Sequence, residues 1–205
     1  MQDFLQAVIL HISNNTLPVC DFVAGQISEI DCHSEFRHQT TQDTKPLACA
    51  HLEQAYSNQN SIDLCRKLAA INEKLLWTEA PRGVISTFMD DNHATVHIAG
   101  LDYGFFAGQL KFGAFLLAPN TIYPLHSHAA EEIYIPVSGS GYWRLRDSSY
   151  KMQKPGSVVH CQSWLPHAIR SGNEPLLMLW AWFGNTSFNA YKIEPNAFND
   201  DGSPN

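Results

Sequence analysis

The chain has 205 residues, of which 44% are hydrophobic, and a formal net charge of −7. Its 13 lysines and arginines do not form the basic clusters that nucleic acid or an anionic membrane surface requires, which excludes both as expected partners. A chain of this length can bury one core and carry an extension, and we expect a small molecule as its partner.

The N-terminal residues have the periodicity of an amphipathic helix. A helix is predicted over about residues 2–13, ending before Asn14-Asn15, by the apolar residues Phe4, Leu5, Val8, Ile9 and Ile12. Residues 24–45 are polar and weakly patterned, and we expect a loop there.

Two further helices are predicted before residue 82. Pro46 stands at a first helical position and opens a short helix that runs to about Tyr56. A second helix begins after Asn60-Ser61 and ends before Pro81, because apolar residues recur at i, i+4, i+7 and i+11: Leu64, Leu68, Ile71 and Leu75. These segments predict a helical N-terminal layer.

After Pro81 the pattern changes to short strand-like runs separated by turns rich in Gly, Pro, Asn and Asp. Many short strands without interleaved helices indicate a sandwich or barrel, and we expect an antiparallel β-barrel. The polar tail beyond about Pro195 is expected to fray. The predicted strands are Val84–Met89, Thr95–Ala99, Phe105–Leu110, Gly113–Leu117, Glu132–Val137, Gly141–Arg146, Ser157–Cys161, His167–Ser171 and Leu177–Phe183.

The residues that carry chemistry gather in one short stretch. His126 and His128 are two residues apart, so both imidazoles point to the same face of an extended strand. Glu132 and Tyr134 repeat this relation, while Glu131 is expected to face away. If the link between the two pairs turns the chain back, four nitrogen and oxygen donors converge, which predicts a metal site. Imidazole with carboxylate suits zinc, iron, manganese or nickel without selecting one of them.

Simpler explanations exist for several of these residues. The histidines and the acid could belong to a polar surface strand, with the spacing a coincidence. Tyr134 could be a hydrogen-bonded phenol that only lines the barrel. Core packing is the favoured explanation for the other aromatic residues of the barrel, namely Phe105, Phe115, Tyr142, Trp143, Trp164, Trp180 and Trp182.

The spacing H-x-H-x3-E-x6-G that begins at His126 resembles the first metal motif of the cupin family. The second cupin motif has a histidine after a Pro-Gly turn, and here Pro155-Gly156 precedes His167. His160 is the rival for this last ligand position. The resemblance covers about residues 105–185 and implies a mainly β fold, a cupin double-stranded β-helix barrel, with one divalent transition metal held by His126, His128, Glu132 and His167.

Two tyrosines narrow the resemblance. Tyr134 shares the inward face with Glu132, and Tyr123 lies three residues before His126. Together with a helical N-terminal layer, this arrangement is similar to that of the bacterial cupin-type dimethylsulfoniopropionate (DMSP) lyases, which split DMSP into dimethyl sulfide and acrylate by β-elimination. The resemblance implies DMSP as substrate and a metal that binds its carboxylate. Strand parity favours Tyr134 as the base, with Tyr123 positioning the substrate or sharing that role.

The fold alone leaves two other functions open: an iron-dependent cupin oxygenase or isomerase, and a cupin sensor of metal or small molecules that is not an enzyme.

We expect a helical N-terminal extension over residues 1–82, the cupin β-barrel over 83–195 and a polar tail over 196–205. Many cupins pair through their barrels, so a homodimer is compatible with the resemblance.

The five cysteines are odd in number and form no Cys-x-x-Cys pair. This argues against a disulfide framework and against a thiolate zinc site. No run approaches the roughly 18 apolar residues of a membrane span, and the first residues lack the basic region of a secretory signal. We therefore expect reduced thiols and a cytoplasmic protein.

Overall fold

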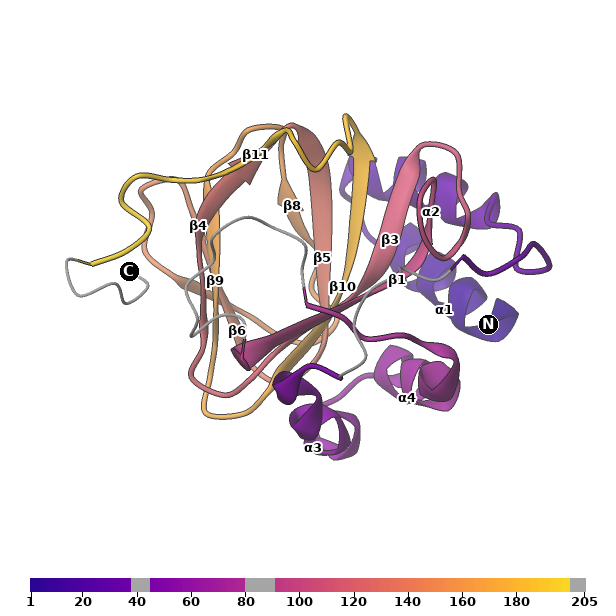
Figure 1. Cartoon of the computed structure of the whole chain (residues 1–205), viewed down its shortest axis with the longest axis horizontal. Coiled ribbons are helices and arrows are strands. Elements are labelled where there is room, and N and C mark those ends of the chain that lie inside the picture. The colour runs from indigo at the N-terminus through magenta and orange to yellow at the C-terminus, as the bar shows by residue number, and fades with distance from the viewer. Residues whose placement is uncertain (38–44, 80–90, 200–205) are drawn as a thin grey trace.

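The computed structural model of the chain describes residues 1–37, 45–79 and 91–199. Two antiparallel sheets curve around a common interior, and the N-terminal helices lie on one side of the barrel that the sheets form (Figure 1). The helices are α1 (Gln2–Ser13), α2 (Pro18–Ser28), the 3-10 helix η1 (Leu47–His51), α3 (Leu52–Ser57), α4 (Asp63–Ile71) and the 3-10 helix η2 (Asn72–Lys74).

Within the described residues, the larger sheet has six strands in the order β2-β1-β3-β10-β5-β8, and the smaller has five in the order β11-β4-β9-β6-β7. All pairings are antiparallel except that of β1 with β2. The strands are β1 (His93–Gly100), β2 (Phe105–Phe106), β3 (Leu110–Leu117), β4 (Ile122–His128), β5 (Ala130–Ser138), β6 (Gly141–Leu145), β7 (Lys151–Gln153), β8 (Val159–Cys161), β9 (His167–Ser171), β10 (Leu176–Gly184) and β11 (Tyr191–Ile193).

The helix predicted over residues 2–13 is confirmed as α1, and its four buried residues belong to the predicted apolar stripe. The predicted loop over residues 24–45 is wrong at its start, because α2 continues to Ser28. Pro18 in the first turn of α2 fixes a helical φ angle. Val23 and Ile27 are buried in the same core as α1, so tertiary packing stabilises a helix whose sequence is only weakly patterned.

The helices predicted after Pro46 and after Ser61 are confirmed, with 3-10 turns at one end of each. The first begins as η1 and continues as α3. The second is α4, which passes into η2 and ends at Lys74, well before Pro81. The division at residue 82 stays a prediction, because it lies outside the described residues.

Most predicted strands in the described residues are present with ends shifted by a few residues, and the exceptions are one strand that is too long and three that were not predicted. The strand predicted at Phe105–Leu110 is too long, since the chain leaves β2 after Phe106. The predicted strands did not include β4, β7 or β11, although the same-face argument for His126 and His128 assumed an extended strand at β4. In the tail that was expected to fray, Ala197 is instead fully buried against the barrel, and Phe198 packs beside it. The predicted strand Val84–Met89 lies outside the described residues.

The large sheet separates two apolar layers, which explains why β1 and β3 are buried along their whole length. On β5, Ile133 and Ile135 point outward into the core shared with the helices. Tyr134, between them, points into the barrel interior among aromatic residues. The alternation predicted from the sequence therefore holds and directs Tyr134 inward. No helix in the described part of the chain is long and apolar enough to span a bilayer.

Candidate metal centre

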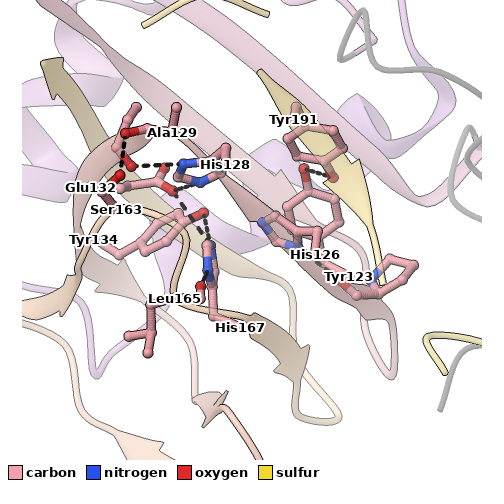
Figure 2. A network of polar contacts seen from close by, with 12 residues as sticks. Tyr123, His126, His128, Ala129, Glu132, Tyr134, Ser163, Leu165, His167 and Tyr191 are labelled. Carbon is pink, nitrogen blue, oxygen red and sulfur yellow. Dashed lines mark hydrogen bonds and ion pairs between the residues drawn. The ribbon is translucent and has the colours of Figure 1, made fainter. Parts of the chain in front are cut away.

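Three buried histidines converge inside the barrel. His126 and His128 come from β4, and His167 comes from β9, where it is the register partner of His126. The nitrogen that each histidine can offer to a metal lies within 4.8 Å of the other two. The tight connection between β4 and β5 also brings Glu132 back beside His128, with 2.9 Å between its Oε2 and the His128 Nε2 (Figure 2).

Backbone carbonyls orient all three imidazoles in the same way. The Nδ1 atoms of His126, His128 and His167 lie 2.7, 2.9 and 2.8 Å from the carbonyl oxygens of Pro124, Ala130 and Leu165. A carbonyl oxygen only accepts a hydrogen bond, so each Nδ1 carries the proton and donates it. In the neutral imidazole the lone pair is then on Nε2, which is the arrangement found in metal-binding histidines.

The carboxylate of Glu132 completes the donor set. Its Oε2 lies 2.9 Å from His128 Nε2 and 3.5 Å from His167 Nε2, and the side chain is 2% exposed. Burial alone would raise the pKa of Glu132, but the adjacent imidazoles of His128 and His167 outweigh it and lower this pKa to about 2. Glu132 therefore stays ionised at neutral pH.

This geometry requires a positive charge within the cluster. With the His128 proton on Nδ1, a lone pair on Nε2 faces a carboxylate oxygen at 2.9 Å, and two acceptors do not approach so closely unless a cation or a second proton lies between them. Imidazole nitrogens and carboxylate oxygens are common ligands of divalent transition metals. The residues present therefore fit a metal ion.

The two predicted tyrosines lie on different sides of the histidines. The Tyr134 hydroxyl is 3.5 Å from His167 Nε2, on the side of Glu132 (Figure 2). The Tyr123 ring lies 4.3 Å from the His126 ring, centroid to centroid, on the other side. Both tyrosines are almost fully buried. The structure thus brings all six predicted site residues into one cluster, with a phenol at each end.

His160 lies apart from this cluster. His160 is on β8, where it is the register partner of Ile133 on β5. Its side chain points outward, and its Nε2 lies 2.9 Å from Glu131 Oε2. Glu131 faces away from the site, as predicted from its position next to Glu132. Of the two rivals for the last ligand position, His167 lies within the histidine cluster and His160 lies outside it.

Two contributors to the site were not predicted in that role. Tyr191 on β11 lies over His126, and its hydroxyl is 3.2 Å from that of Tyr123 (Figure 2). Trp182 packs on His128 with 4.4 Å between ring centroids. Trp182 could have been assigned to the barrel interior from the sequence, because it is two residues from Trp180 and the two side chains share one face of the strand. Tyr191 offered no such signal, because its strand has only three residues.

The fold and the site together define a class: a cupin barrel with a histidine–carboxylate cluster suited to a metal. The family model of dimethylsulfoniopropionate (DMSP) lyase matches residues 23–178, which is most of the chain. The chain belongs to the DMSP lyase family.

Individual relatives agree with this assignment. The DMSP lyase DddQ of Ruegeria pomeroyi is 35% identical over 63 residues, which cover 31% of this chain and 31% of that protein, so the alignment spans about a third of the relative's length. A crystal structure of DddQ from Ruegeria pomeroyi DSS-3 matches with a TM-score of 0.68 and 21% identity, covering 94% of this chain and 97% of that chain. A structure from a study of the DMSP lyases RdDddP and RnDddQII matches with a TM-score of 0.70 and 21% identity, over 94% of this chain and 98% of that chain. At this identity the two structures establish the shared fold.

Proposed function

We propose that this protein is a metal-dependent carbon–sulfur lyase that cleaves DMSP to dimethyl sulfide and acrylate. The observation that carries the proposal is the Tyr134 hydroxyl, buried in the barrel of a DMSP lyase family member and 3.5 Å from a histidine of the candidate metal cluster. Tyr134 would then act as a base next to a metal ion that can bind the substrate carboxylate.

The reaction begins with removal of a proton from the carbon next to the carboxylate. The negative charge of the carboxylate opposes this step, because charge accumulates on the same group as an enediolate. A divalent metal held by His126, His128, Glu132 and His167 would supply Lewis acidity that disperses this charge.

Tyr134 is the proposed base. A free tyrosine has a pKa of about 10, three units above neutral, so holding the phenolate at pH 7 requires roughly 4 kcal/mol of differential stabilisation. A cation held by the cluster would favour the phenolate, because the Tyr134 hydroxyl lies in a buried site and 3.5 Å from His167 Nε2, a candidate ligand atom. Tyr123, at the opposite end of the cluster, is proposed to position the substrate.

The remainder of the elimination needs no general acid. The electron pair of the broken C–H bond forms the carbon–carbon double bond of acrylate, the C–S bond breaks, and dimethyl sulfide leaves as a neutral molecule. The proton remains on Tyr134 and is released to regenerate the base. The sulfonium of the substrate is a cation of low polarity that aromatic faces accommodate, and Trp180 and Trp182 line the interior next to His128.

The direct test is formation of both products by the purified protein. Protein freed of metal with a chelator is reconstituted separately with zinc, iron, manganese and nickel and incubated with DMSP. Dimethyl sulfide is measured in the headspace, and acrylate is measured in solution. The expected result is equimolar production of both with at least one metal, and the same rate for the His160→Ala control, which changes a histidine outside the cluster. Stoichiometric metal binding without either product would exclude the lyase.

A further inference from the structure

Tyr191 covers one side of the candidate metal centre. It opens β11, a three-residue strand at the edge of the smaller sheet, which pairs with β4 alone among the described strands and places Tyr191 opposite His128. The start of this strand is held by a hydrogen bond of 2.9 Å from the Ala129 amide to the Ala190 carbonyl. The side chain points toward the histidines and is half-buried, whereas the next residue, Lys192, is exposed (Figure 2).

The hydroxyl of Tyr191 contacts the hydroxyl of Tyr123, with 3.2 Å between the oxygens. The Tyr123 ring is held between His126 at 4.3 Å and Phe115 at 5.2 Å, measured between centroids. These ring contacts fix the plane of the Tyr123 ring. The hydrogen bond with Tyr191 constrains the direction of the Tyr123 O–H bond, because it directs either the proton or a lone pair of Tyr123 toward β11.

The ring of Tyr191 has a second set of contacts. It is stacked on His126 at 5.3 Å with 28° between the planes, and on His128 at 6.1 Å with 14° between the planes. Trp182 packs against His128 at 4.4 Å. These aromatic contacts add to the hydrogen bonds from each Nδ1 in fixing where the imidazoles point.

We propose that Tyr191 is a positioning residue with two separable functions. Its hydroxyl orients the hydroxyl of Tyr123, and its ring orients His126 and His128 for metal binding. The first function rests on the proposed lyase activity, whereas the second does not depend on which reaction the site performs.

Tyr191→Phe tests the hydroxyl, because it keeps the ring. Loss of one neutral hydrogen bond that orients a group in the active site corresponds to a fall in kcat of about three- to tenfold. KM for DMSP and the metal affinity remain at wild-type values. In the Tyr123→Phe background the same substitution has no further effect on kcat, because the group that it orients is already absent.

Tyr191→Ala tests the ring, and the readout is metal affinity measured by competition with a chromogenic chelator, without substrate. A tenfold or greater loss is expected, in the range seen when groups that orient metal ligands are removed. Tyr191→Phe retains the affinity and thereby separates the ring from the hydroxyl. Lys192→Ala is the matched control on the outward face of the same strand, where a surface ion pair with Glu194 contributes little. Thermal melting of each variant without metal verifies that the barrel is folded.

Three results would overturn the proposal. An unchanged kcat in Tyr191→Phe, or an equal additional loss in the Tyr123→Phe background, refutes the role of the hydroxyl. A folded Tyr191→Ala variant with wild-type metal affinity refutes the role of the ring. If the wild-type protein forms no dimethyl sulfide, the lyase assignment fails by itself, while the chelator competition still decides the role of the ring.

Discussion

Replacing Tyr134 by phenylalanine removes a single oxygen from the barrel interior. The substitution is expected to change stability little and turnover strongly. The side chain is 2% exposed, and its ring stays in place in the variant. The contact that is lost, to His167 Nε2, is 3.5 Å long, so unfolding becomes easier by no more than about 1.5 kcal/mol. For a chain of this size that corresponds to a decrease in Tm of about 3–6 °C. A positioned base contributes about 10²- to 10⁴-fold to the rate, so turnover falls by at least two orders of magnitude.

Three measurements on the same preparation decide this prediction. Metal content by mass spectrometry is expected to equal that of the wild type, because the histidines and Glu132 are untouched. Substrate affinity, measured as KM or by calorimetry with DMSP, is expected to be largely retained. Dimethyl sulfide production is expected to be nearly abolished. A Tyr134→Phe variant that is fully loaded with metal and turns over within about threefold of the wild type would remove Tyr134 as the base.

Further predictions concern the cluster, the barrel wall and the buried thiols. His128→Ala and Glu132→Ala are expected to lose metal and dimethyl sulfide production together, whereas Glu131→Ala, which changes the outward-facing neighbour, retains both. Gly113→Ala places a methyl group 2.0 Å from a backbone carbonyl oxygen and is expected to destabilise the fold by about 1–3 kcal/mol or more in urea unfolding. Burial raises the pKa of Cys65 from 9.0 to about 11. The stability that the neutral thiol contributes is present below pH 9 and lost as the pH rises through 11, so the urea midpoint falls over this interval, and it falls less in Cys65→Ala.

The features of the fold that sequence reasoning predicted are those with a local periodic signal. The apolar stripe of α1 and the alternation around Tyr134 both follow from single elements, and both are present. The start of the predicted loop at residue 24 was wrong because α2 is stabilised by burial of Val23 and Ile27 against α1 rather than by its own pattern. The two-residue β2 likewise exists only through pairing with β1.

In the candidate site too, residues placed by local spacing could be predicted from the sequence, whereas residues placed by the sheet as a whole could not. His126, His128 and Glu132 lie on two strands joined by a short connection, so their convergence could be inferred from parity. The choice between His160 and His167 depends on which strand pairs with β4, and this is a property of the sheet as a whole. Tyr191 was missed because a three-residue edge strand carries no periodicity of its own, and its position follows only from hydrogen bonding to β4.

The most direct test of the account is a titration of metal-free protein with the activating divalent ion while dimethyl sulfide formation from DMSP is recorded. The account predicts no activity without metal, a rate that rises in proportion to bound metal, and saturation at one ion per chain. Full DMSP cleavage by the metal-free protein, or none at full occupancy of the site, would contradict it.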